Sequence, residues 1–207
     1  MSGVKRSGAS GAVTIGVLAL QGDVREHLEA LRRHGLRGVE VKTREGLAGV
    51  DGLIIPGGES TTVAKLLERF GLREPLVERI RAGMPTWGTC MGMIVLAKEV
   101  VGLPDQPTLG VLDVTVRRNA FGRQVESAEV PLRIAALGPQ AFPGVFIRAP
   151  WVERAGEGVE VLCSLEGKGV MVRQGNILGT SFHPELTRDG RIHAWFAQWC
   201  GRVKNAA

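Results

Sequence analysis

Short apolar runs alternate with helically spaced apolar positions through roughly the first half of the chain. The run VTIGVLAL at 13–20 is rich in β-branched residues and predicts a buried strand. After it, Val24, Leu28 and Leu31 follow the spacing of one helix face, and Asp23 stands where a helix cap belongs. Repeated alternation of this kind predicts β-α-β units, and hence a mostly parallel sheet with helices on both faces.

The remaining elements follow from the same criteria. Further strands are predicted at 38–42, 51–58 and 84–88, and helices over 63–70, 74–83 and 91–100. From about 108 to 182, strand-like runs succeed one another between glycine-rich turns, which predicts an antiparallel extension of the sheet. A final helix places aromatic residues along one face, where we expect core packing rather than a cofactor role. These positions are Ile192, Trp195, Phe196 and Trp199. The expected fold class is therefore α/β.

The chain of 207 residues is long enough for one domain with a full core. We assign a single domain to 13–203, because no linker-like stretch interrupts it. The glycine- and serine-rich start, 1–12, and the last residues, 204–207, are expected to be tails. No stretch approaches the roughly 20 apolar residues that span a bilayer, and no cleavage site follows 13–20. We expect a cytoplasmic protein without a membrane partner.

Charge and cysteine usage exclude further classes of function. The net charge is +5, but basic and acidic residues are interleaved and the chain has no tyrosine to stack on bases. No nucleic-acid partner is therefore expected. The three cysteines are far apart and form no C-x-x-C pair, so neither a disulfide framework nor a metal site is indicated. Cys163 and Cys200 lie in apolar patterns and are interpreted as core residues. No cofactor is indicated.

Cys90 differs from the other cysteines because glycines stand two residues to either side of it, in the sequence GTCMG. A strand that turns sharply into a helix needs small residues at these positions, and the turn presents the central side chain as a nucleophile. The start of the helix would favour a thiolate, and the amide of Met91 would face an oxyanion formed beside the sulfur. The alternative is a small buried thiol at a tight turn.

His183 is the candidate base for this thiol. It ends a predicted strand and is followed by Pro184, which keeps the segment extended. In an extended segment residues i and i+2 share one side, so Glu185 can orient the His183 ring. We expect a triad of Cys90, His183 and Glu185; the alternative is a His-Pro turn with a solvated glutamate. The other histidines, interpreted as surface or structural residues, are His27, His34 and His193.

The segment LIIPGGESTT combines a strand end, two glycines and a helix start near Ser60. Glycine amides ahead of a helix N-terminus favour anions. The segment lacks both the G-K-[ST] ending of a P-loop and the G-x-G-x-x-G pattern, so a phosphate site is disfavoured. We expect instead a second oxyanion-binding amide near Gly57 or Gly58, together with polar groups that grip a substrate.

In this order, the PGG, G-x-C-x-G and F-H-P-E segments resemble those of the class I, or triad, glutamine amidotransferases. The segments PGGEST and RNAFGRQ are more specific and resemble the glutaminase subunits of pyridoxal 5′-phosphate synthase. The similar segments extend from residue 15 to 187, and Asp23 departs from the family pattern outside the triad. The resemblance implies a flavodoxin-like α/β fold. It also implies hydrolysis of L-glutamine to L-glutamate and ammonia through a glutamyl thioester on Cys90.

The resemblance further implies roles for single residues. Gly58 and Met91 would supply the amides of the oxyanion hole, and Gln21 would act at the interface with a partner, where it helps to complete that hole. Glutamine would be bound by Gly58, Glu59, Ser60, Arg118, Ile147 and Arg148. Arginine suits the α-carboxylate and glutamate suits the α-ammonium group. The residues alone do not distinguish Arg118 from the other arginines of VRRNAFGRQ.

The implied partner is a TIM-barrel synthase subunit that receives the ammonia. The two subunits would form a large ring assembly in equal numbers, and the free glutaminase would be poorly active. Pyridoxal 5′-phosphate would be the partner's product and not a cofactor bound by this chain.

Three other functions remain open. One is the glutaminase subunit of another amidotransferase, such as imidazole glycerol phosphate synthase. Another is a cysteine-dependent hydrolase or protease on a similar sheet, although there a histidine usually follows the cysteine directly, and here Met91 does. The third is a regulatory or scaffold protein with a relic triad.

Overall fold

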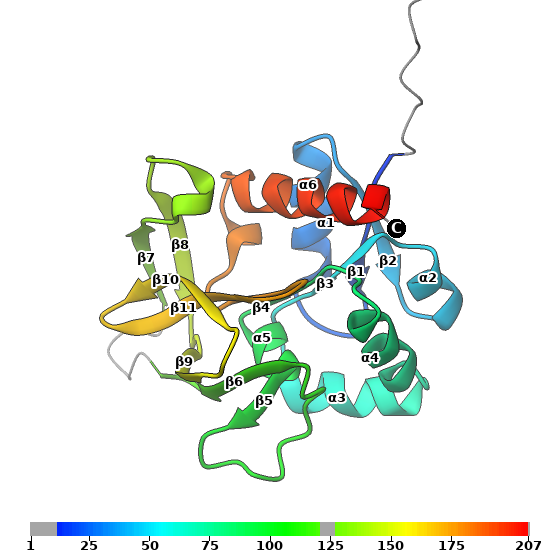
Figure 1. Cartoon of the computed structure of the whole chain (residues 1–207), viewed down its shortest axis with the longest axis horizontal. Coiled ribbons are helices and arrows are strands. Elements are labelled where there is room, and N and C mark those ends of the chain that lie inside the picture. Colours follow the sequence, from blue (N-terminus) through cyan, green and yellow to red (C-terminus); the bar gives the residue numbers. More distant parts are fainter. Residues whose placement is uncertain (1–11, 121–126, 207) are drawn as a thin grey trace, which may run out of the picture.

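The structure, a computed structural model, describes residues 12–120 and 127–206 of the chain. Its elements in chain order are β1 (Thr14–Leu18), α1 (Val24–Arg33), β2 (Arg37–Val41), α2 (Arg44–Ala48), β3 (Gly52–Ile55), α3 (Ser60–Arg69), α4 (Arg73–Arg81), β4 (Thr86–Thr89), α5 (Met91–Leu96), β5 (Ala97–Val100), β6 (Leu112–Arg117), β7 (Ser127–Leu132), η1 (Ala135–Leu137), β8 (Phe142–Ile147), β9 (Trp151–Ala155), β10 (Glu160–Leu165), β11 (Lys168–Gln174), β12 (Ile177–Thr180), η2 (Pro184–Leu186) and α6 (Arg191–Ala206). Helices α1 and α6 cover one face of the main sheet, and α3, α4 and α5 cover the other (Figure 1).

The main sheet has a parallel and an antiparallel half. Its strand order is β2-β1-β3-β4-β12-β11-β9-β6-β5, with β10 paired to β11. Neighbours from β2 to β12 are parallel, whereas β11 is antiparallel to both β12 and β9. A separate antiparallel pair, β7 and β8, makes the second sheet. The expected fold class, a mostly parallel sheet with an antiparallel extension, is confirmed.

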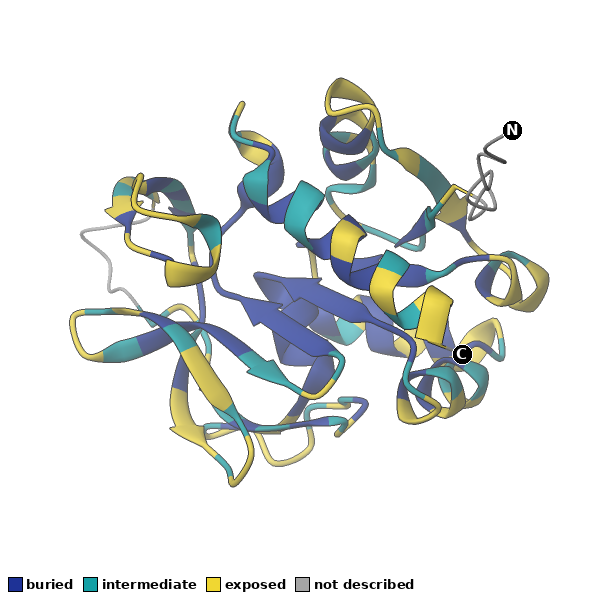
Figure 2. Ribbon diagram, turned by 45° about the horizontal axis from the view of Figure 1, so that its top comes forward, coloured by how far each residue is buried: buried dark blue, intermediate teal, exposed yellow. Residues whose placement is uncertain are grey.

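The central strands are buried on both faces. Every residue of β3, β4 and β12 is buried, which explains why these segments carry no charged residue and show no alternation of exposed and buried positions. Figure 2 shows this buried centre and the exposed residues on the outer strands and outer helix faces. Trp87, in the middle of β4, is fully buried. Its indole nitrogen donates a hydrogen bond to Thr180 Oγ1 of β12 at 3.1 Å.

The structure corrects several predicted elements. The helix predicted over 91–100 ends at Leu96, and Ala97–Val100 forms strand β5. Because the whole 91–97 stretch is buried, its composition could not separate a buried helix from a buried strand. Strand β9 and the short helix α2 were not predicted. The strand near 177 was placed with the antiparallel runs, but β12 pairs in parallel with β4.

The sequence predicts tails at both ends of the domain. Helix α6 extends to Ala206, so it includes most of the segment that we expected to be a C-terminal tail. Most of the predicted N-terminal tail, 1–11, and residues 121–126, which include the last four residues of the RNAFGRQ segment, lie outside the described residues. Across the described ranges, no helix is both long and apolar enough to cross a membrane.

Candidate active site

The candidate residues gather at one edge of the sheet. Strands β1, β3, β4 and β12 run parallel, so the loops that follow them all leave from the same edge. These loops carry Gln21 after β1, Gly58 after β3, Cys90 after β4 and His183 after β12. Ligands of open α/β sheets bind at this carboxyl edge. Residues that are far apart in the sequence thus meet because their strands are neighbours.

Cys90 occupies the corner between β4 and α5. Its φ of 48° and ψ of −108° are a strained combination for a residue with a side chain. The flanking glycines make the corner possible. A Cβ on Gly88 would lie 2.4 Å from the Gly92 carbonyl carbon, and one on Gly92 would lie 2.0 Å from the Ile55 oxygen. The corner therefore has the geometry of a nucleophile elbow.

His183 and Glu185 form the expected pair, but the local backbone differs from the prediction. His183 Nδ1 lies 2.7 Å from Glu185 Oε1. Pro184 begins the 3₁₀ turn η2, so Glu185 belongs to this turn and not to an extended segment. The two side chains still meet because the turn is short and His183, the residue that caps its start, keeps a non-helical backbone. Both side chains are buried.

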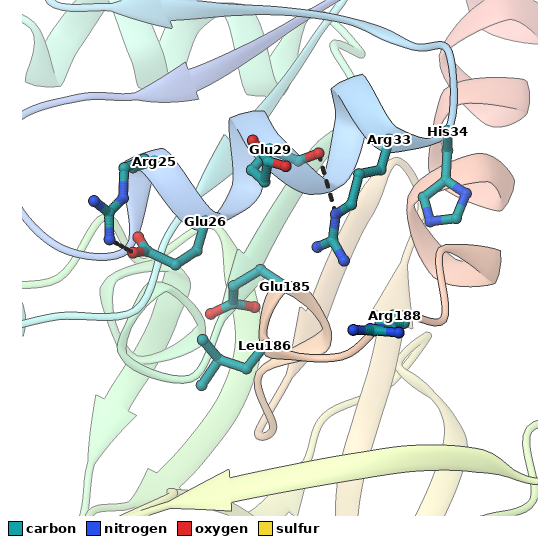
Figure 3. A pocket seen from close by; sticks show the side chains of 8 residues that line it. All are labelled: Arg25, Glu26, Glu29, Arg33, His34, Glu185, Leu186 and Arg188. Atoms are coloured by element: carbon teal, nitrogen blue, oxygen red, sulfur yellow. Dashed lines mark hydrogen bonds and ion pairs between the residues drawn. The ribbon is translucent and has the colours of Figure 1, made fainter.

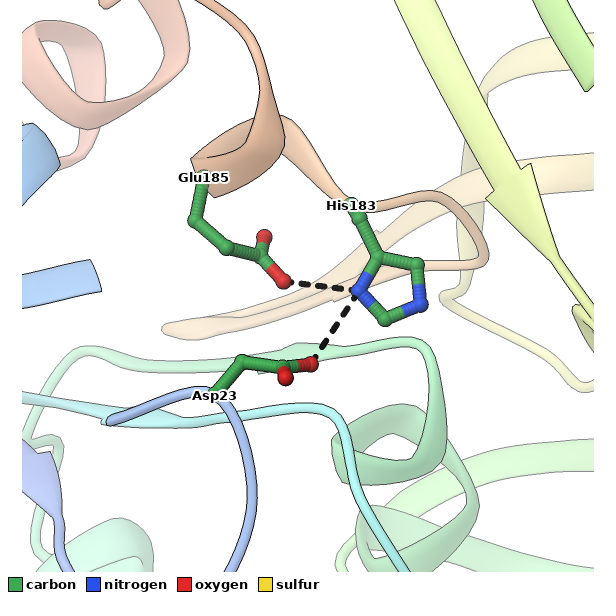
Figure 4. Close-up of side chains that lie close together, drawn as sticks. All are labelled: Asp23, His183 and Glu185. Carbon is green, nitrogen blue, oxygen red and sulfur yellow. Dashed lines mark hydrogen bonds and ion pairs between the residues drawn. The ribbon is translucent and has the colours of Figure 1, made fainter. Parts of the chain in front are cut away.

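A second carboxylate faces the same imidazole nitrogen. Asp23 Oδ2 lies 3.4 Å from His183 Nδ1 (Figure 4). The sequence predicted Asp23 as the cap of α1, and it does occupy that position, but its side chain makes no capping hydrogen bond. Burial lowers the pKa of His183, yet interactions with Asp23, Cys90 and Glu185 outweigh it and raise this pKa well above its usual range. The site therefore favours a protonated imidazole beside the sulfur.

The donor atoms of Asp23, His183 and Glu185 lie within 4.8 Å of one another, so they could in principle hold a metal ion. The 2.7 Å contact between His183 and Glu185 has the length of a charge-assisted hydrogen bond. Burial raises the pKa of Glu185, and its contact with His183 opposes that effect. We interpret the group as a proton-handling site, because a metal would displace this hydrogen bond.

A cavity of about 310 Å³ opens beside Cys90. The predicted residues that line it are Gly58, Glu59, Ser60, Cys90, Met91, Arg118, Ile147, Arg148 and His183. Asp23, Ile94, Asn119, Pro150 and Leu186, which the sequence did not single out as site residues, complete the lining. The Cys90 sulfur lies 3.9 Å from the Ile147 carbonyl oxygen. Cys90 is thus buried but not sealed in, since it is 8% exposed and faces this cavity.

Opposite charges meet across the cavity mouth. Arg118 Nη2 lies 3.4 Å from Glu59 Oε1, and Arg118 Nη1 donates to Gln106 Oε1 at 3.3 Å. Ser60, the first residue of α3, has a buried hydroxyl without a hydrogen-bond partner among the described residues. The cavity thus offers a cation, an anion and an unused hydroxyl to a ligand. This set complements a small zwitterion.

Gln21 supports the loop that follows β3. Its Oε1 accepts a hydrogen bond from the Glu59 amide at 2.7 Å. The Asp23 amide donates to the Gly57 carbonyl at 3.0 Å, which ties the β1–α1 loop to the same segment. A Cβ on Gly22 would lie 1.7 Å from that carbonyl oxygen, so only glycine allows the two loops to approach so closely. Gln21 itself does not line the cavity.

A larger and more open hollow lies between α1 and η2 (Figure 3). Its lining is mostly charged and consists of Arg25, Glu26, Glu29, Arg33, His34, Glu185, Leu186 and Arg188. Cys90 does not line this hollow, so we place the reaction in the smaller cavity. Glu185 lies between the two, with His183 on its cavity side.

Asp23 is the functional candidate that sequence reasoning missed. In the sequence, Asp23 follows Gln21-Gly22 and directly precedes a predicted helix, so a role as helix cap already accounts for an aspartate at this position. Its approach to His183 depends on the contact between the β1–α1 loop and Gly57, which joins segments far apart in the chain. No local pattern contains that information.

The fold and this site define a class, the glutamine amidotransferases. A crystal structure titled as a glutamine amidotransferase superposes with a TM-score of 0.86 at 54% identity, covering 90% of this chain and 98% of that one. The structure of PurLQS from Thermotoga maritima shares the fold at a TM-score of 0.65 and 17% identity, covering 91% and 98% of the two chains.

The chain belongs to the SNO glutamine amidotransferase family, whose model matches residues 17–202. A relative from Kineococcus radiotolerans, pyridoxal 5′-phosphate synthase subunit PdxT, is 59% identical over 195 residues, covering 90% of this chain and 94% of its own length. The protein of the same name from Thermus thermophilus is 55% identical over 188 residues, covering 90% and 97%. The family resemblance inferred from the motifs is confirmed.

Proposed function

We propose that this protein is a glutaminase that supplies ammonia for pyridoxal 5′-phosphate synthesis, as the names of its relatives suggest. The observation that carries the proposal is the strained Cys90 corner beside the His183–Glu185 hydrogen bond, at a cavity with both charges of an amino-acid binding site. A phosphate site or a structural thiol would need neither the imidazole nor the Arg118–Glu59 pair.

In the proposed reaction, the Cys90 sulfur attacks the side-chain amide carbon of glutamine while its proton resides on His183. The amides of Gly58 and Met91 hold the resulting oxyanion. The carbon–nitrogen bond then breaks, His183 gives its proton to the leaving nitrogen, and ammonia departs from a glutamyl thioester. Water next attacks the thioester, His183 accepts its proton, and breakage of the carbon–sulfur bond releases glutamate and returns the site to its starting state.

The cavity lining supplies the binding contacts. Arg118 pairs with the α-carboxylate and Glu59 with the α-ammonium group, so that glutamine replaces the ion pair that these two side chains make with each other. The buried Ser60 hydroxyl, Gly58, Ile147 and the backbone of Arg148 complete the contacts with the substrate. Arg148 has a φ of 43°, a strained value that fits a backbone held for binding.

Ammonia passes to a TIM-barrel synthase subunit, which docks against the β1–α1 segment near Gln21 in a ring with equal numbers of both subunits. The Gln21–Glu59 hydrogen bond gives such a partner a direct route to the loop that carries Gly58. The cytoplasmic location stays a prediction.

The decisive experiment measures ammonia release from glutamine by the full chain, alone and with its synthase subunit. We expect release that increases on docking. Acid quenching during turnover followed by mass spectrometry is expected to find a glutamyl adduct on the peptide that contains Cys90. A demonstrated complex that releases no ammonia and forms no adduct would contradict the proposal, and an adduct on another residue would contradict the assignment of the nucleophile.

A further inference from the structure

A fully buried polar cluster lies behind Glu185, on the side away from Cys90. His27, on α1, is 0% exposed, and its Nε2 lies 3.4 Å from Glu185 Oε2 and 3.1 Å from Thr89 Oγ1. Its Nδ1 lies 3.1 Å from Nε2 of His193, a second buried histidine on α6. From the sequence, both histidines are interpreted as surface or structural residues. Their helical spacing does not indicate a contact with Glu185. Buried polar groups without partners are costly, so the pattern of hydrogens in this cluster is constrained.

Hydrogen positions follow from the contacts. Burial, with repulsion from His193 and His183, lowers the pKa of His27, and burial with repulsion from His34 and Arg33 lowers that of His193 to about 3. Each ring is therefore neutral and carries one hydrogen. With a hydrogen on Nε2, His27 donates to Thr89 Oγ1 at 3.1 Å, and the same N–H faces Glu185 Oε2 at 3.4 Å, an oxygen that has no hydrogen-bond partner among the described residues. A bare Nε2 would turn a lone pair toward this buried carboxylate.

The His27–His193 contact supports the same assignment. With its hydrogen on Nε2, His27 accepts through Nδ1 from His193 Nε2, and His193 Nδ1 is left as a bare acceptor. His193 Nδ1 has no hydrogen-bond partner among the described residues. In the opposite arrangement a buried N–H would be unpaired there, and Glu185 Oε2 would lose its nearest donor. The first arrangement leaves fewer buried donors unsatisfied.

We propose that His27 is a positioning residue that holds Glu185 through Oε2 while Glu185 holds His183 through Oε1. The relay then extends from Cys90 through His183 and Glu185 to His27, and His193 fixes the tautomer of His27. This inference rests on the proposed glutaminase reaction, because it assigns a role in orienting that reaction's base. His27 itself does not line the cavity that holds Cys90.

The proposal predicts a pH effect as well as a rate effect. Burial already raises the pKa of Glu185, so loss of His27 is expected to raise it further, because the N–H that faces the charged form of the carboxylate is removed. The acidic limb of the kcat/KM profile would then move to higher pH. The other groups near Glu185 are unchanged by the substitution. They are His183, Asp23 and the charged residues of the larger hollow between α1 and η2.

The test compares His27→Leu, His27→Gln and the control Leu31→Ala in the complex with the synthase subunit. His27→Leu is expected to lower kcat by about ten- to a hundredfold, the effect of losing one hydrogen bond to a charged group, with little change in KM. His27→Gln, whose amide N–H can replace Nε2–H, is expected to restore most of kcat and the wild-type acidic limb. Leu31→Ala removes a buried side chain of the same helix. It should lower stability without moving the pH profile.

A second measurement holds even if His27→Leu fails to fold. Nitrogen-15 NMR of the wild-type chain, with its histidines labelled, reports which nitrogen of each ring carries hydrogen. We expect His27 protonated at Nε2. A hydrogen on Nδ1 would overturn the proposal, as would full activity and an unshifted acidic limb in His27→Leu. If the wild-type complex hydrolyses no glutamine, the proposed function is wrong. The NMR measurement then still tests whether His27 carries its hydrogen on Nε2.

Discussion

The two halves of the main sheet contribute differently to the same cavity. The parallel half supplies the groups of the proposed bond-breaking step, and they are almost completely enclosed: Cys90 is 8% exposed, His183 6% and Glu185 2%. The antiparallel half and the second sheet supply Arg118, Ile147 and Arg148. The Arg118 side chain is 31% exposed and is held by a 3.4 Å ion pair with Glu59 and a 3.3 Å hydrogen bond to Gln106. The difference indicates rigid positioning of the reacting groups and adjustable binding of the substrate.

A backbone contact joins the parallel half of the main sheet to the second sheet at His183, the proposed base. The His183 amide donates to the Val145 carbonyl of β8 at 2.8 Å. His183 thus follows a strand of the parallel half but is also held by the second sheet, whose β8 ends at Ile147 in the cavity. We expect substitutions in the parallel half to lower kcat and substitutions in the antiparallel half to raise KM.

The largest effect is expected from Cys90→Ala. If the sulfur is the nucleophile, as proposed, glutamine hydrolysis should fall by about 10⁴-fold or more, while the thermal midpoint changes little. Ammonia release in the complex and a thermal melt measure the two quantities. Cys163→Ala is the matched control, since Cys163 is equally buried but lies on β10 of the antiparallel half. Retained activity in Cys90→Ala, or a loss of activity in the control, would refute the assignment of the reacting groups to the parallel half.

Gly92→Ala should have the next largest effect, through the backbone. Its added Cβ would lie 2.0 Å from the Ile55 oxygen, so the corner at Cys90 must shift. We expect a loss of about 2 kcal/mol or more in the free energy of unfolding and a larger fall in kcat than in substrate affinity. The control, Gly169→Ala on β11, places its Cβ 3.3 Å from Val152. Denaturant titration and steady-state kinetics decide whether the strained corner is needed.

Arg118→Ala tests the antiparallel half. Loss of the partner for the α-carboxylate should raise KM by about ten- to a hundredfold, the effect of one charge-assisted hydrogen bond, with a smaller change in kcat. The neighbouring arginine provides the control, because Arg117 pairs with Glu153 at 3.1 Å and does not line the cavity. Arg117→Ala should leave both constants nearly unchanged. Equal effects of the two substitutions would contradict the binding role of Arg118.

This pair of arginines also shows where prediction from sequence ends. The thiol, its two glycines and the His183–Glu185 pair could be predicted, because local backbone geometry dictates which residue types fit a sharp corner. Arg117 ends β6 and Arg118 follows it directly, and the sequence does not reveal which of the two reaches the cavity, since that depends on how β6 pairs with β9. Arg118 was therefore selected only through the family resemblance.

The same limit applies to the fold. The alternation of short apolar runs and helical spacings sufficed for strands β1 to β4 of the parallel half, but it missed α2 and placed β12 with the antiparallel runs. It failed at Ala97–Val100, where a fully buried helix passes directly into a strand and the apolar pattern does not change. It also missed the contacts of Asp23 and His27 with the catalytic pair, which arise only when α1 packs against η2.

The smallest effect is expected from Asp23→Asn, which tests whether the two carboxylates beside His183 are equivalent. Both face Nδ1, but Glu185 is completely enclosed and lies at 2.7 Å, whereas the Asp23 side chain is 36% exposed and lies at 3.4 Å. Because Asp23 helps to raise the pKa of His183, its neutralisation should lower that pKa. The alkaline limb of kcat/KM, where the imidazolium loses its proton, would then move to lower pH.

Solvent screening at an exposed carboxylate keeps the change in kcat below about tenfold, whereas Glu185→Gln should cost far more. Comparing the pH profiles of the two variants in the complex separates these roles. If Asp23→Asn were as damaging as Glu185→Gln, the second carboxylate would be an equal partner of the base. In that case the enclosed groups, Cys90, His183 and Glu185, would not by themselves account for the chemistry.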